Sequence, residues 1–439
     1  MKASVSALVA NNLCTGCGVC TSESKGALEM KWNDNGFLIP VHNGKEYDVE
    51  KAVKVCPFNP IPDDSVKDED VLSKKYLKDT TKYDNKIGNY INTYVGYSNQ
   101  YRTTSSSGGI ATYVFRQLLI LKIVDFLYIV KEDRGSYSYQ LYSNVEDIEL
   151  ISKTRYIPVT MESLFNQIDS LEGKVAISGV ACFIKAIRLK QHYNPDLYEK
   201  IPFLVGIICG GWKSRFFTEY LAHNSGITGS YNKQEYRIKD ESSSASDYSF
   251  GAFNDLGDFR QIKMSTVGDM WGTGLFKSRA CDFCTDVMTE LADISLGDAW
   301  LPEFRDQGLG NSIIITRSKL SQKLIFDGIS SNDLTISPLD KEKIIQSQKP
   351  SFAHRQDAIL FRTRLSKLFG KLIPHVRKRV LKSISIPYAI VQIQRERTRS
   401  KSFEYWSKFK NSSQFKMKMK TDLYILKWLT IINQKLRNK

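Results

Sequence analysis

Three cysteines spaced two residues apart near the N-terminus restrict what this chain can fold into more than any other feature. Cys14, Cys17 and Cys20 form the pattern C-x2-C-x2-C in the stretch NNLCTGCGVCTSESKG. A loop with this spacing can wrap three corners of an iron–sulfur cubane, and in proteins with two cubanes it continues to a fourth cysteine that binds the second cluster. That position here is Ser24, followed by lysine instead of proline. The loop itself therefore lacks the ligand for a second cluster.

A fourth cysteine for the first cluster stands further along the chain, at Cys56 in VKVCPF. A Cys-Pro outside the loop is typical of the remote ligand that completes a cluster begun by C-x2-C-x2-C. Gly16 and Gly18 would let the loop curl around a cube. We predict a ferredoxin-like module over residues 1–62, in which one 4Fe-4S cluster is bound by Cys14, Cys17, Cys20 and Cys56. A zinc ion bound by the same four thiolates is the alternative.

The positive charge of the chain is concentrated at its C-terminal end. Residues 361–439 contain 21 Lys and Arg against 3 Asp and Glu, whereas residues 1–360 contain 41 against 44. A nucleic-acid-binding protein would spread basic residues over its folded body, so we expect no nucleic-acid partner. The tail instead contains basic segments with apolar faces, such as KMKTDLYILKWLTIINQKLRNK. These either pack on the body as a solvated helical tail or contact an anionic membrane surface or an acidic partner.

The start of the chain and its most apolar window bear on where the protein works. MKASVSALVANNLC has no positive segment followed by a long apolar run, so we expect a cytoplasmic protein. A peripheral position at the inner membrane surface is compatible with this expectation. The window over 114–130 contains Arg116, Lys122 and Asp125, which are costly at the centre of a bilayer. We predict an amphipathic helix that runs into a buried strand there, and no membrane span.

The order of elements indicates an α/β (α+β) fold. Residues 63–90 are rich in charge and are expected to form a surface linker that could include one short helix. Residues 91–345 alternate strand-like and helical runs and are expected to form a mixed α/β domain, and residues 346–439 a basic helical tail. Strands are predicted over 92–99, 124–132, 173–180, 201–211 and 311–318, and helices over 107–122, 161–171 and 181–193.

Four further cysteines lie within the predicted α/β domain: Cys182, Cys209, Cys281 and Cys284. They are far apart in sequence, so their spacing alone does not make them a site. Cys182 and Cys209 either are small buried residues at strand ends or belong to a site, because both follow strand-like runs beside glycine, where sites form in open sheets. Cys281 and Cys284 form a C-x2-C pair, which is a ready chelate.

Four segments in a fixed order make the chain recognisable: SSSGGIAT, SGVACFIKAIR, GIICGGWKS and CDFCTDVMTELADISLGDAW. As an ordered set they resemble the beta subunit of the coenzyme F-420 (deazaflavin) hydrogenase/dehydrogenase family, which includes bacterial iron–sulfur flavoproteins often encoded among polysaccharide genes. The resemblance covers about residues 10 to 345 and leaves out the tail. It implies that a second 4Fe-4S cluster is bound beside a flavin by Cys182, Cys209, Cys281 and Cys284.

The same resemblance implies an FAD site that opens with a flavin-contacting turn and helix. The implied contacts are Ser106, Ser107, Gly108, Gly109, Thr112, Lys153, Arg155, Gly179 and Asp298, with Lys185, Asp293 and Trp300 as further candidates. Backbone amides of the Ser/Gly turn would bind the pyrophosphate and the cations would face a phosphate or the flavin ring. The alternatives are a plain helix N-cap, surface cations and a structural strand end. The chain departs from the family at Val180-Ala181, where a small residue and proline usually precede the cysteine, and in its basic segment, Lys153 to Tyr156.

Together these features predict an FAD-containing oxidoreductase. By the resemblance, the N-terminal cluster would exchange electrons with a ferredoxin-like donor or a partner subunit, and the second cluster would relay them to the flavin. The flavin would reduce or oxidise a small substrate, for which a polysaccharide-pathway intermediate is a candidate. One alternative is a non-catalytic electron-transfer subunit that keeps clusters without flavin, and another is a zinc-stapled binding protein with a membrane- or nucleic-acid-contacting tail. The five histidines are scattered, and no catalytic residue is predicted.

Overall fold

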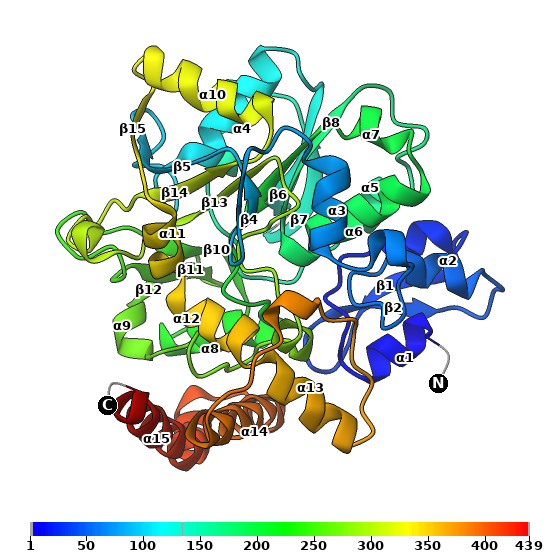
Figure 1. The fold of residues 1–439 in the computed structure, drawn as a ribbon. Helices are drawn as coiled ribbons and strands as arrows, with labels where there is room; N and C mark the ends of the chain where they lie inside the picture. The colour runs from blue at the N-terminus through cyan, green and yellow to red at the C-terminus, as the bar shows by residue number, and fades with distance from the viewer. Residues whose placement is uncertain (1–2, 134, 147, 438–439) are drawn as a thin grey trace.

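An eight-stranded mixed sheet forms the centre of the molecule in the computed structural model, which describes residues 3–133, 135–146 and 148–437 (Figure 1). The strand order is β15-β5-β14-β13-β9-β8-β6-β7, in which β6, β8, β9 and β13 are parallel and the outer strands pair antiparallel. The strands are β5 (Asn92–Ser98), β6 (Phe126–Asp133), β7 (Ser136–Tyr142), β8 (Val175–Val180), β9 (Phe203–Ile207), β13 (Ile294–Asp298), β14 (Ser312–Thr316) and β15 (Leu334–Pro338). The predicted mixed α/β class is thereby confirmed.

Helices cover both faces of this sheet, and each face has its own apolar core. Val175 and Ile177 of β8 pack with one cluster, which includes Phe183 and Ile187 of the helix that follows, whereas Ala176 packs with the cluster on the other face. Strands buried on both faces are typical of parallel segments. The covering helices are α4 (Ile110–Ile120) and α10 (Lys319–Ser330) on one face, and α6 (Ala181–Tyr193) and α5 (Glu162–Phe165) on the other.

Three parallel neighbours, β8, β9 and β13, end at the same edge of the sheet. Gly179 of β8 pairs with Gly206 of β9, and Ile207 of β9 pairs with Leu296 of β13. Cys182 and Cys209 follow directly after the first two of these strands. The carboxyl ends of parallel strands are where sites form in open α/β sheets.

The N-terminal module packs beside this sheet and contains a small antiparallel hairpin. Its elements are α1 (Val5–Ala10), η1 (Val19–Glu23), β1 (Leu28–Trp32), β2 (Leu38–His42) and α2 (Val49–Lys54). The expected surface linker over 63–90 is instead a packed segment. It forms η2 (Asp64–Val66), α3 (Glu69–Tyr76) and the hairpin of β3 (Lys82–Asp84) and β4 (Gly88–Tyr90). Leu72 and Ile87 in it are fully buried, because its few apolar residues face the body.

A second sheet, which the sequence did not predict, follows β9. Its strands are β10 (Tyr231–Ile238), β11 (Ser249–Asn254) and β12 (Phe259–Lys263), in consecutive antiparallel order. The shorter elements of the body are η3 (Ile148–Ile151), α7 (Leu197–Lys200), α8 (Arg215–Asn224), α9 (Met264–Val267), η4 (Arg279–Asp282) and η5 (Pro302–Phe304). Phe216 and Phe217 of α8 pack against Tyr236 and Phe250 of this sheet.

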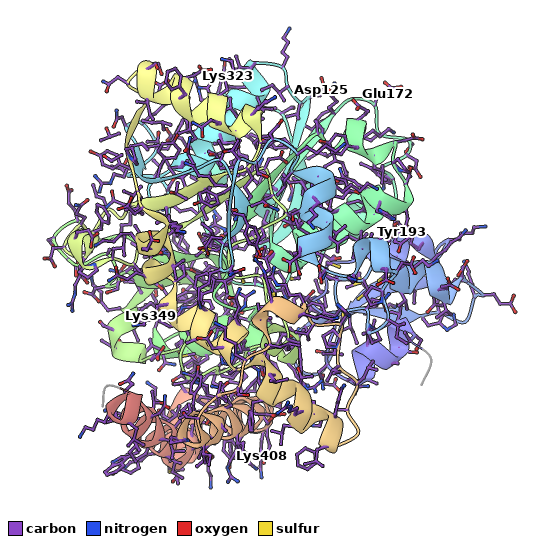
Figure 2. All side chains as sticks on the ribbon, in the orientation of Figure 1. Asp125, Glu172, Tyr193, Lys323, Lys349 and Lys408 are labelled. Carbon is purple, nitrogen blue, oxygen red and sulfur yellow. The ribbon has the colours of Figure 1, made fainter. Side chains whose placement is uncertain are left out.

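The C-terminal segment is helical and packs closely against the body. It consists of α11 (Lys341–Ser347), α12 (Lys349–Phe352), a π-helical turn η6 (Ala353–Asp357), α13 (Ile359–Leu368), η7 (Lys378–Val380), α14 (Ile386–Phe409) and α15 (Ser412–Arg437). Trp406 and Phe415 share an apolar cluster with Phe276 of the body. Figure 2 labels Lys408 on this segment, at the face of the molecule opposite Lys323 of α10. No helix among the described residues is long and apolar enough to cross a membrane.

Candidate redox centres

The four cysteines of the N-terminal module line one cavity. Cys14 and Cys17 lie in the loop between α1 and η1, Cys20 lies in η1, and Cys56 follows α2. The cavity has an empty volume of about 430 Å³, part of it open to solvent, and its other walls include Leu8, Leu13 and Val55. Gly16 and Gly18 both have positive φ, and a Cβ at Gly18 would lie 2.1 Å from the hydroxyl of Thr160. The curl expected for this loop therefore requires glycine.

Burial makes free thiolates costly in this cavity. The pKa of Cys20 is raised, first by burial and then by the neighbouring thiols of Cys17, Cys14 and Cys56. Four such groups become stable thiolates only when they bind a cation or a cationic cluster. Among the described residues, no group of three or more His, Cys, Asp or Glu side chains is placed as a single-ion site. In donor chemistry the four thiols of this module fit a 4Fe-4S cluster, and four thiolates also bind a zinc ion in other proteins.

Ser24, where a two-cluster loop would have its fourth cysteine, has a structural role. Its side chain is fully buried, donates a hydrogen bond to the carbonyl of Thr21 at 2.7 Å and accepts one from the amide of Leu28 at 3.0 Å. These bonds connect the end of η1 to the start of β1. The serine thus stabilises the turn into the hairpin.

The other four cysteines, distant in sequence, are brought together in the fold. Cys182 lies in the first turn of α6, Cys209 follows β9, and the C-x2-C pair spans the end of η4. The pKa of Cys182 is raised by burial and then by the thiols of Cys284, Cys209 and Cys281. The amide of Trp212 donates a hydrogen bond to Sγ of Cys281 at 3.1 Å, a donor that would stabilise a thiolate there. The structure therefore brings together the set that the resemblance implied.

Arg355, which the sequence did not single out, lies against this second group. Its guanidinium donates to Sγ of Cys284 at 2.7 Å, to the carbonyl of Cys209 at 2.6 Å and to the carbonyl of Asp286. The side chain is buried, and although burial alone would lower its pKa, the thiols of Cys284, Cys209 and Cys281 raise it. It supplies positive charge beside four potential thiolates. No signal distinguished it from the other basic residues of the tail.

The two cysteine groups lie on either side of Pro57 and Phe58. These two residues line the cavity of the first group and also a second cavity, which Cys182 and Cys284 line. The hydroxyl of Tyr139 is close enough to both groups to respond to them, because its pKa is raised first by burial and Tyr128 and then by the thiols of Cys182 and Cys17. The two candidate cluster sites are therefore neighbours.

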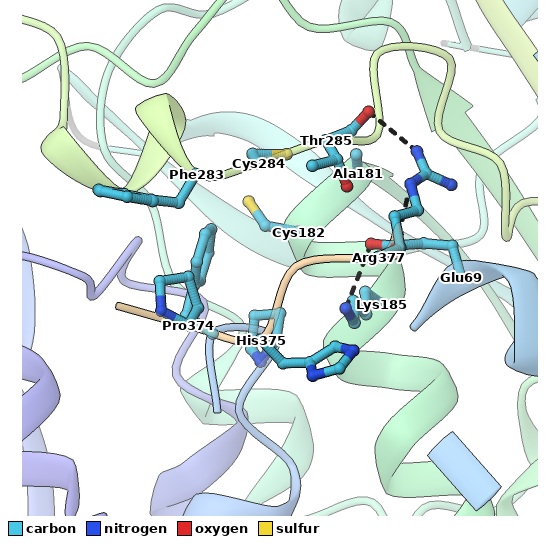
Figure 3. Close-up of a pocket in the computed structure, with 12 residues that line it drawn as sticks. Glu69, Ala181, Cys182, Lys185, Phe283, Cys284, Thr285, Pro374, His375 and Arg377 are labelled. Atoms are coloured by element: carbon cyan, nitrogen blue, oxygen red, sulfur yellow. Dashed lines mark hydrogen bonds and ion pairs between the residues drawn. The ribbon is translucent and has the colours of Figure 1, made fainter. Parts of the chain in front are cut away.

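Charged residues line the second cavity opposite the cysteines (Figure 3). Figure 3 shows Lys185 pointing to Glu69, and their ion pair measures 3.2 Å. Burial alone would raise the pKa of Glu69, but Lys185 and Arg377 hold it at about 2. Lys185, a candidate flavin contact, is thus paired with a carboxylate from α3.

The Ser/Gly turn before α4 is held by bonds within the protein. Ser106 Oγ accepts a hydrogen bond from the amide of Thr154 at 2.8 Å, and the amide of Gly108 donates to Ser312 Oγ at 3.1 Å. Ser107 Oγ donates to the carbonyl of Asn311 at 3.1 Å. The Gly108 amide therefore already has a partner, so the expectation that it binds a pyrophosphate is not supported. Gly109 is the N-cap of α4 and has a φ of 81°.

A cluster of cations stands beside this turn. Lys239 donates to the carbonyl of Ser107 at 2.6 Å, and its pKa is lowered to about 7, first by burial and then by Arg237, Lys153 and Arg102. Crowded, partly buried cations of this kind fit an anionic ligand. Arg155 lies 4.4 Å from the ring centroid of Tyr137, and its buried Nε has no hydrogen-bond partner in the described structure. Lys153 forms an ion pair with Glu235 at 3.2 Å.

The remaining candidates fall into two places. Asp298, at the end of β13, accepts a hydrogen bond from Arg237 at 2.6 Å, and that guanidinium lies 5.4 Å from the ring centroid of Trp300. Gly179 lies within β8, and Thr112 Oγ1 lies 2.8 Å from Ser152 Oγ inside the core. Asp293 accepts a hydrogen bond from Arg188 at 3.1 Å, and this buried pair is part of the core.

Two family models match the chain across the parts that hold the second cysteine group and the Ser/Gly turn. Residues 93–166 match the model of the coenzyme F420 hydrogenase/dehydrogenase beta subunit N-terminus, and residues 172–342 match the model of the C-terminus of the same subunit. Together they cover more than half of the chain. The chain belongs to the family of coenzyme F420 hydrogenase/dehydrogenase beta subunits. The resemblance found in the sequence motifs is confirmed.

Individual relatives agree with this assignment. A subunit of the F420H2 dehydrogenase of Methanosarcina mazei is 19% identical over 387 residues, which are 86% of this chain and 93% of that protein. A chain of the F420-reducing NiFe hydrogenase complex from Methanosarcina barkeri superposes with a TM-score of 0.52 and 20% identity, over 67% of this chain and 99% of that one. At this identity the superposition supports the fold alone.

The family of these beta subunits consists of redox proteins of the iron–sulfur flavoprotein type, so the coarse prediction of an oxidoreductase is confirmed. The N-terminal model contains the Ser/Gly turn, Lys153 and Arg155, and the C-terminal model contains all four cysteines of the second group. The first cysteine group and Arg355 lie outside both models. They extend the beta-subunit core at its two ends.

Proposed function

We propose that this beta-subunit relative is an FAD-containing oxidoreductase with two 4Fe-4S clusters. One would be bound by Cys14, Cys17, Cys20 and Cys56, and the other by Cys182, Cys209, Cys281 and Cys284. The observation that supports this most is the placement of two groups of four buried or half-buried cysteines on either side of Pro57 and Phe58. Clusters pass single electrons, whereas a flavin accepts a hydride.

The chain's own residues have distinct roles in this proposal. Arg355 and the amide of Trp212 stabilise negative charge on the second thiol group. The cations Lys239, Lys153 and Arg155 provide the charge that a flavin phosphate needs. Asp298 holds Arg237 in place at the edge of the sheet. Phe58, which lines both cavities, would exclude water between the two groups.

The proposed partners are an electron donor or acceptor protein and a small substrate. The solved relative belongs to a multi-subunit hydrogenase complex, which makes a partner subunit a reasonable proposal for this chain. The N-terminal module would be the point of exchange, because it packs at the side of the sheet (Figure 1). For the small substrate we retain a polysaccharide-pathway intermediate as the candidate.

Metal and flavin analysis of protein purified anaerobically tests the proposal. We expect about eight iron and eight sulfide per chain, from two four-iron clusters, and about one FAD. Zinc without iron would overturn the redox assignment. Iron without flavin would instead favour the alternative, an electron-transfer subunit that keeps clusters only.

The C-terminal helix supports a peripheral contact of this protein with a membrane on its cytoplasmic side. Its apolar side chains recur at helical spacing and are exposed, with Trp428 at 55% and Leu436 at 53%. The stripe consists of Tyr424, Ile425, Trp428, Ile431, Ile432 and Leu436. Lys420, Lys427 and Lys435 flank it, and a helix of this composition binds the surface of anionic bilayers.

A further inference from the structure

A third cavity lies between the body and the C-terminal helices, and it shares no lining residue with the two cysteine cavities. One wall is formed by the loop from Trp271 to Lys277, and the other by α12, η6, α13 and α14. Its empty volume is about 700 Å³, part of it open to solvent. The helical wall lies beyond residue 342, where the family model ends. The cavity is therefore built largely by the part of the chain that the family core lacks.

Positive charge exceeds negative charge around this cavity. Its lining includes five Lys or Arg side chains and two carboxylates: Lys277, Arg355, Arg362, Arg395 and Arg399 against Asp282 and Glu396. If Arg355 is assigned to the thiols beside it, four cations still face two carboxylates. Burial and the neighbouring Arg399 and Arg395 lower the pKa of Arg362 to about 10, as expected where cations crowd together.

The carboxylates do not satisfy all of these cations. Asp282 forms ion pairs with Lys277 at 2.8 Å and with Arg399. Arg362 donates to the carbonyl of Asp282 at 2.9 Å and to Oε1 of Gln392 at 2.8 Å, but its Nη2 has no partner in the described structure. The Nε2 of Gln392 has none either. Arg362 is 6% exposed and Gln392 3% exposed, so two buried donors remain unsatisfied beside the cavity.

Unsatisfied guanidinium and amide donors in a cationic cavity identify the ligand chemistry. A guanidinium presents paired N–H groups that match the oxygens of phosphate, and an excess of two or more positive charges calls for a polyvalent anion. Trp271 adds an apolar wall to the cavity. We propose that this cavity binds the phosphate or diphosphate group of a small organic molecule.

The cavity lies next to the second cysteine group. Gly210, in its wall, follows Cys209, and Arg355 bonds to Sγ of Cys284. A ligand here would be held close to the proposed second cluster. Binding itself needs only the side chains named above, so it can be measured whether or not the chain contains iron or flavin.

Calorimetric titration of the full chain with inorganic pyrophosphate, and separately with inorganic phosphate, tests this proposal. Arg395 lines the cavity and is partly exposed. Arg395→Gln removes its positive charge, and we expect this change to weaken pyrophosphate binding by about tenfold or more. Arg397→Gln is the matched control, because Arg397 lies on the same helix but pairs with Asp422 of α15 at 2.8 Å. We expect the affinity of R397Q for pyrophosphate to stay within about twofold of that of the unchanged chain.

A second variant guards against a loss of binding caused by misfolding. Gln392→Glu has nearly the same shape and would pair with Arg362, so the fold should persist, whereas its negative charge should abolish pyrophosphate binding. Absence of binding of both anions to the unchanged chain would overturn the proposal. Binding that R395Q and Q392E leave intact, or that R397Q reduces equally, would also overturn it, since the anion would then bind elsewhere. None of these outcomes depends on the metal or flavin content.

Discussion

The guanidinium of Arg355 donates a hydrogen bond to Sγ of Cys284 across 2.7 Å. These residues are 71 positions apart and belong to different parts of the chain, the C-terminal helices and the family core. Burial raises the pKa of Cys284, and Arg355 acts against this rise. The C-terminal segment thus contributes directly to the chemistry of the second cysteine group.

Replacing Arg355 should make the proposed second cluster harder to reduce. Arg355→Gln removes a positive charge from beside the thiolates, and reduction adds negative charge, so the midpoint potential should fall by on the order of 50 mV. Potentiometric titration followed by electron paramagnetic resonance measures this shift. Arg364→Gln, at an exposed position of α13, is the control and should leave the potential unchanged. A potential that does not move in R355Q would show that no cluster lies beside this residue.

Single cysteine substitutions should remove one cluster at a time. Cys56→Ser should reduce the iron content from about eight to about four per chain and remove the spectrum of the N-terminal cluster, and Cys182→Ser should remove the other. Each variant is the control for the other. Loss of all iron in both variants, or of none, would contradict the proposed ligand sets.

A buried ion-pair network should make Arg377 important for stability. Arg377 donates two hydrogen bonds to Glu290, at 2.7 and 3.0 Å, and both side chains are at most 2% exposed. Burial alone would raise the pKa of Glu290, but Arg377 and Arg379 lower it, so the carboxylate is charged at neutral pH. Arg377→Leu removes two of the hydrogen bonds to this buried carboxylate and leaves it, among the described residues, only Arg379 as a direct ion-pair partner, so it should cost about 3 kcal/mol of unfolding free energy.

Denaturant unfolding of the holoprotein measures this cost. The folded protein lowers the pKa of Glu290, so the ion pair stabilises the fold fully above the ordinary pKa of a glutamate. This stabilisation is lost as the pH falls through the lowered pKa, so the effect of R377L should shrink in acid. The double variant R377L/E290Q should recover part of the loss, since the buried side chain at position 290 is then neutral. Lys378→Leu, at the exposed neighbouring position, should change stability by less than about 0.5 kcal/mol. An equal effect of the two single variants would disprove the assignment.

The affinity for FAD should depend on the protonation of Lys239. Burial and then Arg237, Lys153 and Arg102 lower its pKa to about 7, so the side chain gains its positive charge as pH falls through 7. An anionic phosphate beside it should then bind about tenfold more tightly at pH 6 than at pH 8.5. Fluorescence quenching of FAD by flavin-free protein measures the affinity.

Two variants separate this effect from general changes of charge. Lys239→Met should remove the pH dependence, whereas Lys233→Met, at an exposed position of β10, the strand that Lys239 directly follows, should retain it. The same pH profile in K239M would place the phosphate elsewhere.

Local patterns predicted individual elements well but not how they assemble. The apolar spacing over 181–193 predicted α6 with its observed bounds. The helix predicted over 161–171 is limited to α5, because Ser170 bonds to the carbonyl of Gln167 and Lys200 binds the carbonyls of the following turn instead. Polar residues that bond locally compete with helix formation, which an apolar period does not reveal.

The candidate site, too, could be predicted only where its residues form a local pattern in the sequence. The first cysteine group follows from C-x2-C-x2-C and one Cys-Pro, a local pattern. The second group depends on the order of β8, β9 and β13 in the sheet, so spacing left it open and only the resemblance suggested it. The sequence predicts that the amide of Gly108 binds a phosphate, yet a Cβ at this position would lie 2.5 Å from the carbonyl of Gly96, so close packing alone requires the glycine. Arg355 and Lys239 act through long-range contacts that leave no pattern in the sequence.

The exposed stripe of α15 should bind anionic bilayers. In a vesicle sedimentation assay we expect the protein to bind phosphatidylglycerol vesicles, to bind phosphatidylcholine vesicles several-fold more weakly, and to dissociate as salt screens the lysines. Trp428→Ser removes an aromatic anchor and should reduce binding several-fold. Tyr198→Ser is the control, because Tyr198 is an aromatic residue of similar exposure, at 43%, on α7 at the opposite side of the molecule (Figure 1). Equal binding by W428S and Y198S, or none by the unchanged chain, would exclude the membrane contact and leave the tail as a helical cover of the body.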